Sequence, residues 1–436
     1  MNISILTLFP QLYSEFLNTS LLKKAQENKI VDFDLKSLFD FARPKERIDA
    51  PAFGPGAGML IKPEIVEQAV NFQELKFDKS FKIFFSPQGK QLDQTFLQNL
   101  YTRIKDQKHI MLLASRYEGM DARVEEYYAD EIISIGNFVT MGGDLPAMVF
   151  LESFLRFFPG VVGKVSSVER DSFSGPFVDY PSYTEPIEWN GLKVPEILRS
   201  GNHALIEQWR LDKAAQKSVI DHFEWVRSYP LTDAQKNEAQ KFIPNHYVVL
   251  MHTDVLVQDG SAGQTSVTSI DIHDIARSSA TYGIENYFIV TPLLDQQKIV
   301  NKLLHFWKEG YGYAYNPQRF QALKRVFLKD SLNSVIEEIR EKEGKEPIII
   351  STSAKRSKSS ISYFDQSKVW SLNRPVLFVF GTGQGLSKEL IEKSDFVLNP
   401  VEGFTDFNHL SVRSAVAIIL DRWLALNPGA AKGYAE

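Results

Sequence analysis

Residues 131–158 read EIISIGNFVTMGGDLPAMVFLESFLRFF. The first five residues have the composition of a short buried strand, and a loop with three glycines follows them. From Ala147 to Phe158 the residues are apolar around most of a helical circumference, which indicates a buried helix. A buried strand, a glycine loop at its carboxyl end and a buried helix are typical of a parallel sheet with helices on both faces.

The rest of the chain repeats this alternation of strands and helices. In the first half, strands are predicted at 2–8, 31–37, 82–85, 110–114 and 131–135, helices at 12–25 and 63–72, and a loop at 42–58. In the second half, strands are predicted near 247–257, 287–290, 347–351, 376–380 and 396–398. The predicted fold class is therefore α/β, with parallel sheets in both halves.

Four segments are predicted along the chain. Residues 1–160 form a first α/β domain, and residues 161–176 (VVGKVSSVERDSFSGP) carry few apolar anchors and indicate a flexible linker. Residues 177–243 indicate a small helical domain. The boundary falls near Pro244, after which a second α/β domain extends over residues 244–436.

The composition excludes several classes of protein. The chain has 436 residues, 44 % of them hydrophobic and 24 % charged, which suits two or three globular domains. No run reaches about 18 uncharged apolar residues, and the N-terminus lacks the features of a signal peptide, so we expect no membrane span and a cytoplasmic location. The absence of cysteine excludes disulfides, iron–sulfur clusters and cysteine-ligated zinc.

Charge and histidine spacing set further limits. The net charge is −5, so any RNA must be bound by a local basic patch and by shape rather than by bulk charge. The eight histidines show no metal-binding spacing such as H-E-x-x-H. The sequence therefore predicts no dedicated metal site.

Glycine-containing loops follow four of the predicted strands: SPQGK (86–90), SRYEG (115–119), IGNFVTMGGDLPAM (135–148) and FGTGQGL (380–386). Ligands of open α/β sheets bind beyond the carboxyl ends of the strands, and glycine lets the backbone approach a ligand closely. The alternative is that each loop is only a tight turn. Three such loops within the first 150 residues favour a ligand pocket.

Familiar nucleotide-binding motifs do not explain these loops. GPGAG (54–58) lacks the Lys-Ser/Thr of a phosphate-binding loop. GTGQG (381–385) comes about 50 residues before the chain end, too late for a dinucleotide fold, and Asp395 opens the next strand instead of closing it. A G-x-S-x-G nucleophile motif is also absent from the sequence.

Nine motifs, in order over roughly residues 1–240, are more specific. They are ILTLFP (5–10), GPGAGML (54–60), FSPQGK (85–90), ASRYEGMDARV (114–124), SIGNFVTMGGDLPAM (134–148), SFLRFFPGVVG (153–163), RDSF (170–173), YPSYTEP (180–186) and VPEILRSGNHALIEQWR (194–210). Together they resemble bacterial tRNA (guanine-N1)-methyltransferases, the TrmD family. The resemblance implies a SPOUT-class trefoil-knot fold, S-adenosylmethionine as cofactor, tRNA as partner, a homodimer, and methylation of the guanosine 3′-adjacent to the anticodon.

The same resemblance implies where the cofactor is held. Three loops near 85–89, 115–119 and 135–143 would form the knot, with Glu118 facing the amino end of the cofactor. The implied cofactor-binding residues are Phe85, Ser86, Pro87, Ser115, Tyr117, Glu118, Ile135, Gly136, Phe138, Thr140, Gly142 and Gly143. The alternative for Tyr117 is a core aromatic residue, and for Glu118 a surface acid. Family members also depend on Mg²⁺, for which Glu118 and Asp171 are the neighbourhood considered.

Methylation at N1 of guanine requires a base for the N1 proton and a cation facing the carbonyl oxygen at C6. By the resemblance, Asp171 is the base and Arg156 the cation. A free Asp has a pKa of about 3.9, which makes it a weak base unless it is desolvated or positioned. The resemblance implies that the linker carrying Asp171 reaches the other subunit's pocket and is ordered by RNA.

RNA contacts are expected from the small helical domain and the glycine loop. The candidates are Arg43, Lys45, Arg47, Gly58, Ser200, Asn202, His203 and Arg210. Asn202 and His203 have the alternative role of a helix cap alone. Arg210 has the alternative role of a helix surface residue.

A few residues depart from the family pattern. Ser115 stands where the family usually has Gly, Phe138 where it has Tyr, and Asp144 where it has Glu; Gly-Pro-Gly (54–56) replaces three glycines. Because none of these changes removes a proposed catalytic group, we expect activity to persist with altered affinity. The alternative for the whole chain is a non-catalytic RNA-binding protein on a knotted scaffold.

The second half resembles SpoU-type methyltransferases more loosely. SIDIHDIARSSATYG (269–283) resembles their first motif, and FVFGTGQGL (378–386), FVLNPVEG (396–403) and HLSVRSAVAIILDRW (409–423) resemble their second and third. The implied cofactor-binding residues are Phe380, Gly381, Gly383, Gly385, Leu398, Pro400, His409 and Leu410. The last helix parallels the one at 147–158, which indicates two related folds in tandem.

The role of this second half stays open at the level of sequence. It is either a second RNA methyltransferase or a cofactor- or RNA-binding module that dimerises without chemistry. Arg277 is a candidate RNA contact, and its alternative is a salt bridge to Asp274 three residues earlier.

Overall fold

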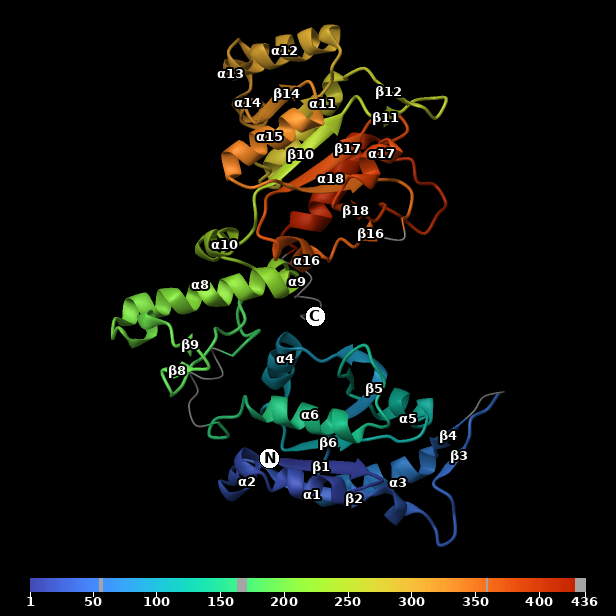
Figure 1. The fold of residues 1–436 in the computed structure, drawn as a ribbon. Coiled ribbons are helices and arrows are strands. Elements are labelled where there is room, and N and C mark those ends of the chain that lie inside the picture. The colour runs from blue at the N-terminus through green and yellow to red at the C-terminus, as the bar shows by residue number, and fades with distance from the viewer. Residues whose placement is uncertain (55–57, 163–170, 358–359, 428–436) are drawn as a thin grey trace. The chain divides into compact units, whose positions relative to one another are not determined.

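The computed structural model describes residues 1–54, 58–162, 171–357 and 360–427 (Figure 1). They divide into two compact units, Met1–Gly175 and a unit that begins at Pro176, and each unit has its own parallel sheet and apolar core. The centre of the predicted linker (163–170) and part of the GPGAG loop (55–57) lie outside the described residues. The trefoil knot and the domain boundaries stay predictions.

The first unit is built on a parallel sheet in the order β2-β1-β6-β5-β7. Its strands are β1 (Asn2–Thr7), β2 (Asp32–Ser37), β5 (Phe81–Gln91), β6 (His109–Leu113) and β7 (Glu131–Ser134), beside a hairpin of β3 (Asp49–Pro51) and β4 (Met59–Ile61). The predicted strands are confirmed. The inner strands β1 and β6 form because apolar residues fill positions that are buried on both faces, whereas the edge strand β2 is only half-buried.

Helices cover both faces of this sheet, as the alternation predicts. They are α1 (Gln11–Leu17), α2 (Ser20–Glu27), η1 (Leu38–Phe41), α3 (Pro63–Phe77), α4 (Gln94–Ile104), α5 (Ala122–Tyr128) and α6 (Asp144–Leu155). Residues of α1, α2, α4 and α6 share one apolar cluster, and residues of η1, α3 and α5 share another. The helix predicted at 12–25 is divided in two at Asn18, whose backbone N–H ends α1.

The segment predicted as the loop 86–90 belongs to the long strand β5. Phe85 pairs with Ile133 of β7, and Lys90 returns to the same residue, so the chain between them leaves the ladder and rejoins it. At Gly89 a Cβ atom would lie 2.6 Å from the backbone of Ile132. Only glycine permits this approach, which is why the strand can bulge there and continue.

The second unit carries a larger parallel sheet in the order β14-β13-β10-β17-β15-β18-β16. Its strands are β10 (His246–Met251), β13 (Tyr287–Val290), β14 (Val326–Lys329), β15 (Ile348–Thr352), β16 (Ser360–Ile361), β17 (Val376–Gly381) and β18 (Phe396–Leu398), beside a hairpin of β11 (Val255–Leu256) and β12 (Ala262–Gly263). The sequence missed β14 and β16, which are short edge strands. Five adjacent strands of this sheet, β13-β10-β17-β15-β18, correspond to β2-β1-β6-β5-β7 of the first sheet. In both sets the order across the sheet, ranked along the chain, is second, first, fourth, third and fifth. The related folds in tandem are therefore confirmed at the level of strand order.

Helices cover both faces of this sheet as well. They are α11 (Ser269–Thr281), α12 (Leu294–Lys308), α13 (Gly312–Tyr315), α14 (Pro317–Leu323), α15 (Leu332–Glu343), α16 (Gln366–Trp370), α17 (Lys388–Glu392) and α18 (Val412–Leu424). Residues of α11, α12, α14, α16 and α18 share one cluster, whereas α15 and α17 pack on the other face. The closing helix α18 follows β18 as α6 follows β7.

Residues 176–243 belong to the second unit. They contain a small hairpin of β8 (Glu188–Trp189) and β9 (Leu192–Lys193), then η2 (Glu196–Arg199), α8 (His203–Asp221), α9 (Phe223–Ser228) and α10 (Asp233–Gln240). Val219, Phe223 and Val226 lie in the same apolar core as β10. Arg227 is buried and donates to the carbonyls of Arg422 (2.6 Å) and Asp421 (3.1 Å) at the end of α18. The helical segment therefore shares its core with the second sheet.

Candidate functional site

The three loops expected to hold the cofactor follow neighbouring strands of the first sheet. Because β5, β6 and β7 are parallel, their carboxyl ends meet at one edge. The side chain of Phe85 is buried in the core, so only its backbone groups can contact a ligand. Pro87, Tyr117 and Phe138 are exposed. Tyr117 adopts a positive φ of 59°, which turns its backbone at the tip of the loop after β6. Neither Tyr117 nor Glu118 is buried, so a core role for Tyr117 is not seen.

Two of these loops are in direct contact. The N–H of Gly143 donates to the carbonyl of Ser115 at 2.7 Å, and Arg116 forms an isolated antiparallel bridge with Gly142. A Cβ atom on Gly143 would lie 2.8 Å from the backbone nitrogen of Ser115. Glycine is thus required where the loop before α6 crosses the loop after β6.

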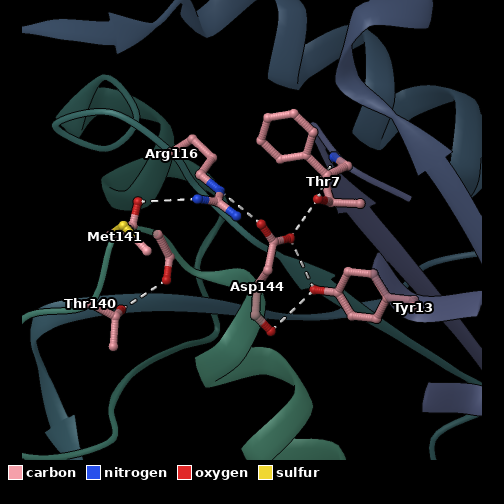
Figure 2. A network of polar contacts seen from close by, with 8 residues as sticks. Thr7, Tyr13, Arg116, Thr140, Met141 and Asp144 are labelled. Carbon is pink, nitrogen blue, oxygen red and sulfur yellow. Dashed lines mark hydrogen bonds and ion pairs between the residues drawn. The ribbon is translucent and has the colours of Figure 1, made fainter. Parts of the chain in front are cut away.

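A buried polar network, centred on Asp144, fixes this crossing (Figure 2). Asp144 is 1 % exposed; it accepts from Thr7 Oγ1 at 2.5 Å and from Arg116 Nε at 2.9 Å. Tyr13 donates to the same carboxylate at 3.2 Å, and burial raises the pKa of this phenol. The guanidinium of Arg116 also donates to the carbonyl of Met141 at 3.4 Å. The network joins the end of β1, the loop after β6 and the first turn of α6.

Sequence reasoning missed the partners in this network. It noted Asp144 only as a departure from the family pattern, and it singled out none of Thr7, Tyr13 and Arg116. The segments SRYEG (115–119) and MGGD (141–144) contain Arg116 and Asp144, but neither segment has a pattern that predicts an ion pair between residues 28 positions apart. An acid at the first position of a buried helix is the one feature that could have pointed to it.

Gly58 and Glu118, predicted for RNA and cofactor respectively, lie against each other. The N–H of Glu118 donates to the carbonyl of Met59 at 3.1 Å, and that of Ile61 donates to Gly119 at 3.1 Å. A Cβ atom on Gly58, whose φ is +102°, would overlap the side chain of Glu118. Strand β4 therefore covers the loop that carries Tyr117 and Glu118.

The two predicted catalytic side chains are in contact. Arg156, which ends α6, donates through Nη2 to the Asp171 carboxylate, and both side chains keep part of their surface exposed. This places a carboxylate and a guanidinium together in the first unit, on either side of the segment 163–170, which lies outside the described residues.

In the second unit, the predicted cofactor residues surround the corresponding strand ends. Phe380, Leu398 and Pro400 are buried, whereas His409 and Leu410 are exposed. The loop of Gly381, Gly383 and Gly385 is covered by the hairpin of β11 and β12: Leu256 N–H donates to Gly385 at 2.8 Å, and Gln384 N–H donates back to Leu256 at 2.9 Å. A short hairpin thus covers the equivalent loop in both units.

A chain of neutral groups fixes that loop. Thr382 Oγ1 donates to the carbonyl of Met251 at 2.9 Å and lies 2.5 Å from Thr265 Oγ1, which lies 3.1 Å from Nδ1 of His252. Since the Thr382 hydrogen is already used, Thr265 donates to Thr382 and accepts from Nδ1–H of His252. His252 is fully buried, and burial lowers its pKa to about 4, so the ring is neutral at pH 7. Its Nε2 has no hydrogen-bond partner among the described residues.

Arg277 is exposed on α11 and does not pair with Asp274. The Asp274 carboxylate instead lies 3.6 Å from Nε of Arg413 on α18, and Arg413 also donates to Asp271 at 3.4 Å. The alternative of a local salt bridge for Arg277 is therefore not seen. Arg277 lines a shallow hollow of about 340 Å³ between α11 and α18.

The RNA candidates of the helical segment fall into two roles. Asn202 caps α8, because its side chain accepts from the N–H of Leu205 at 3.3 Å, and His203 is the exposed first residue of that helix. Arg210 pairs with Glu207 at 2.7 Å and lies over the ring of Tyr180. Arg210 also lines a hollow, together with Arg199 and His203.

Family models match both halves of the chain. Residues 1–227 match the family described as tRNA (Guanine-1)-methyltransferase TrmD, which covers more than half of the chain. The chain belongs to the TrmD family. Residues 245–425 match a second family, described as SAM-dependent RNA methyltransferase, so a second RNA methyltransferase domain follows the TrmD region. The chain is thus an S-adenosylmethionine-dependent enzyme.

Individual TrmD relatives agree. A protein of Nitratidesulfovibrio vulgaris named tRNA (guanine-N(1)-)-methyltransferase is 35 % identical over 97 % of this chain and 99 % of its own length. A relative of the same name from Geobacillus kaustophilus is 40 % identical over 54 % of this chain and 96 % of its own length. The crystal structure of tRNA (m1G37) methyltransferase from Aquifex aeolicus is 32 % identical, with a TM-score of 0.41, over 48 % of this chain and 87 % of that chain.

The residues present suit the TrmD cofactor. The carboxyl edge of the first sheet offers backbone groups at the Gly142–Gly143 crossing and the exposed rings of Tyr117 and Phe138, which are suited to an adenine. Within the described residues, His, Asp and Glu form no group of three that could hold a metal ion. None of the helices in that part of the chain is long and apolar enough to cross a bilayer.

Proposed function

We propose that the TrmD region transfers a methyl group from S-adenosylmethionine to N1 of the guanosine 3′-adjacent to the anticodon of tRNA. The observation that carries this proposal is the contact between Arg156 and Asp171 in a chain whose residues 1–227 match the TrmD family. A carboxylate and a guanidinium are the two groups that methylation at N1 of guanine requires.

The proposed roles follow from the chemistry of the base. When bound, S-adenosylmethionine supplies a methyl group on a sulfonium sulfur. The Asp171 carboxylate accepts the N1 proton of guanine, and the Arg156 guanidinium stabilises the negative charge that develops on the C6 oxygen. In this chain Arg156 binds the Asp171 carboxylate itself. The pair must therefore open before the carboxylate accepts a proton, and we assign that step to RNA binding.

The cofactor is proposed to lie across the three loops of the first sheet. Its adenine contacts backbone groups of Phe85, Pro87, Ile135, Gly136, Gly142 and Gly143. The other residues proposed to bind the cofactor are Ser86, Ser115, Phe138 and Thr140. Tyr117 lines the pocket, and Glu118 faces the amino end of the cofactor. Glu118 and Asp171 are also the neighbourhood proposed for Mg²⁺.

The assembly is proposed to be a cytoplasmic homodimer with the loops of each unit knotted. In such a dimer the linker would carry Asp171 to the pocket of the partner. Light scattering of the full-length protein tests the oligomeric state, and a monomer that is fully active would contradict this part of the proposal.

The function is tested with tRNA transcripts and the full-length protein. A transcript with guanosine 3′ of its anticodon should receive one methyl group, identified as N1-methylguanosine after digestion to nucleosides. A transcript with adenosine at that position should receive none from the TrmD region. Labelling of the adenosine transcript at the same site would overturn the assignment.

The target of the second methyltransferase domain is a separate question. We propose that its cofactor lies against the loop of Gly381, Gly383 and Gly385, with Arg277 available for RNA on α11. Methyl incorporation into total RNA by the full-length Asp171→Ala variant, followed by identification of the labelled nucleoside, isolates its activity, because the TrmD region then forms little N1-methylguanosine. If no RNA is labelled and no S-adenosylmethionine binds beyond one site per chain, the domain is a non-catalytic module.

A further inference from the structure

Residues 402–408 (EGFTDFN) lie between β18 and α18 and carry two exposed phenyl rings; we name this segment the aromatic loop. Phe404 is fully exposed and Phe407 is 75 % exposed, whereas Phe378 and Phe380 of β17 are buried in the core. A phenyl ring in water forgoes the free energy that its burial would supply. Two such rings on one short loop therefore indicate a surface that a partner covers.

The aromatic loop is fixed at both ends by the neighbouring loop after β15 (residues 353–357). The Glu402 carboxylate accepts from Nε of Arg356 at 3.0 Å, and the side-chain amide of Asn408 donates to the carbonyl of Ala354 at 2.9 Å. Both phenyl rings lie between these two contacts along the chain. The backbone that presents the rings is thus held in place, which lowers the conformational entropy that binding costs.

The aromatic loop lies at the edge of the sheet that carries the proposed cofactor site of this domain. Strands β17, β15 and β18 are parallel neighbours in that order, so the loops that follow them meet at one edge. The loop after β17 carries Gly381 and Gly383, and the implied cofactor residues Pro400 and His409 flank the aromatic loop in the sequence. An RNA that this domain methylates therefore comes close to the two rings.

The charges around the rings nearly cancel. Lys355 and Arg356 are exposed cations, and Arg356 forms an ion pair with Glu402. Glu402 and Asp406 of the aromatic loop are exposed acids. Because the two signs offset each other, RNA is not held here by charge alone, and the rings have to supply most of the free energy of binding.

The two rings are also separated by polar residues. Thr405 and Asp406 stand between them in the sequence and are exposed, and Gly403 precedes them. A stable protein partner buries a continuous patch with an apolar centre. An unpaired RNA base needs only one ring face, because every base has a π-face that stacks. These residues favour single-stranded RNA over a second copy of the chain.

We propose that the aromatic loop binds unpaired nucleotides of the RNA that the second domain methylates, with bases stacked on Phe404 and Phe407 and a phosphate on Lys355. A duplex keeps its bases stacked inside the helix and cannot offer them to the rings. The inference assigns a substrate class, a single strand or an RNA loop, to this domain. It rests on the proposed function, since it takes the second domain to act on RNA.

Binding of a fluorescent single-stranded oligouridine to the full-length protein, measured by anisotropy, tests this surface. Phe404→Leu and Phe407→Leu should each weaken binding about tenfold, because leucine is apolar but has no ring face for stacking. Phe404→Tyr should bind as the wild type does. Lys355→Gln should reduce the slope of log K against log salt by about 0.7, as one lost phosphate contact on a single strand does.

Photochemical cross-linking locates the contact on the chain. An oligouridine that carries 5-iodouridine should cross-link to the aromatic loop, as identified by mass spectrometry of the peptides. Phe404→Leu should reduce this cross-link, and a duplex of the same length should yield none. Cross-links confined to residues 1–243 would overturn the proposal.

Phe306→Leu and Lys298→Gln are the matched controls. Both residues are exposed on α12, which follows β13 and none of the three strands whose loops form the proposed surface. They should keep the affinity and the salt slope. Losses as large as those of Phe404→Leu and Lys355→Gln would overturn the surface, as would wild-type affinity in both leucine variants of the aromatic loop. Circular dichroism checks that each variant is folded.

Cofactor binding and methylation separate this inference from the proposed function. Equilibrium dialysis should give Phe404→Leu the same number of S-adenosylmethionine molecules per chain as the wild type; a lower number would assign the loop to the cofactor and overturn the proposal. Oligouridine binding that depends on Phe404, in a protein whose Asp171→Ala variant labels no RNA, contradicts methyl transfer by the second domain alone. RNA labelling by that variant, with unchanged binding in both leucine variants, contradicts the surface alone.

Discussion

In the first unit, the loop after β6 is tied to the end of β1 through the charged pair of Arg116 and Asp144. In the second unit, the loop after β17 is tied to the end of β10 through the hydroxyls of Thr382 and Thr265. The two sheets have the same strand order, so these contacts lie at equivalent places, which we call the junction of each unit. The junction is held by different polar groups in the two units. An ion pair with hydroxyl partners fixes the junction of the first unit, and a neutral chain ending at His252 fixes the junction of the second.

The difference between the units has an energetic consequence. Removing one partner of a buried ion pair leaves an unpaired charge in the core. Removing one hydroxyl from a chain of neutral groups leaves an unpaired neutral polar group, which costs less free energy. The first unit should therefore tolerate substitution at its junction less well than the second.

The largest effect is expected from removing the chemistry of the first unit alone. Asp171→Ala should reduce formation of N1-methylguanosine about 10²- to 10⁴-fold, because the N1 proton loses its acceptor, with S-adenosylmethionine binding retained. Single-turnover methylation of a tRNA transcript measures it, and Arg156→Ala should chiefly lower turnover. Asp106→Ala, which removes an exposed carboxylate after α4, should be as active as the wild type. An Asp171→Ala variant of unchanged activity would refute the proposed base.

The next largest effect is expected at the charged junction. Arg116→Ala leaves the Asp144 carboxylate buried without its cation and should destabilise the first unit by about 3–5 kcal/mol. Hydrogen exchange of the β1 and β6 amides measures this loss. Arg123→Ala breaks an ion pair of an exposed arginine with Asp121 and should change the protection of these amides little, because solvent screens such pairs. Equal protection in the two variants would mean that the buried pair adds nothing to the junction.

Acid should destabilise the second unit through two of its buried histidines. His246 accepts from the indoles of Trp370 (3.3 Å) and Trp423 (3.1 Å) and donates from Nδ1 to Pro244, and burial lowers its pKa to about 4, as it does for His252. Both rings are neutral when folded and protonate near pH 6.5 when unfolded. Their stabilising contribution is thus complete above about pH 6.5 and is lost as the pH falls towards 4.

The expected slope is up to about 1.4 kcal/mol per pH unit for each histidine within that window. Urea unfolding followed by tryptophan fluorescence measures it for the second unit, which contains every tryptophan of the chain. His246→Gln should flatten the slope by about half, since glutamine keeps an acceptor without titrating. Stability that is level between pH 7 and pH 4.5 would contradict the assigned neutral rings.

The smallest effect is expected at the neutral junction. Thr382→Val should destabilise the second unit by about 1–2 kcal/mol, because it removes the donor to Met251 and the acceptor for Thr265. The same fluorescence assay measures it. Thr281→Val, which removes an exposed hydroxyl bonded within α11, should change stability by less than about 0.5 kcal/mol. A loss as large as that of Arg116→Ala would erase the contrast between the two junctions.

The strands and the glycine loops could be predicted because their causes are local. Runs of β-branched residues indicate buried strands, and parallel strands bring their carboxyl ends to one edge wherever they are. The rule that loops after parallel strands meet at one edge predicted that the loop of Gly142 and Gly143 lies near the loop of Ser115. The family resemblance added Arg156 and Asp171, which the structure brings into contact.

Polar partners that come from distant parts of the chain could not be predicted. Thr7 and Asp144 are 137 positions apart and belong to no shared motif. The local rule of i, i+3 pairs suggested Asp274 for Arg277, but the packing of α18 on α11 gives Asp274 to Arg413 instead. Both contacts depend on tertiary packing, which cannot be predicted from the spacing of residues in the sequence.

The sharing of one apolar core between residues 176–243 and the second sheet limits how this protein can be shortened. Val219, Phe223 and Val226 are covered by that core, and Arg227 is held by the last turn of α18. A chain cut after residue 243 would present these side chains to water and should self-associate.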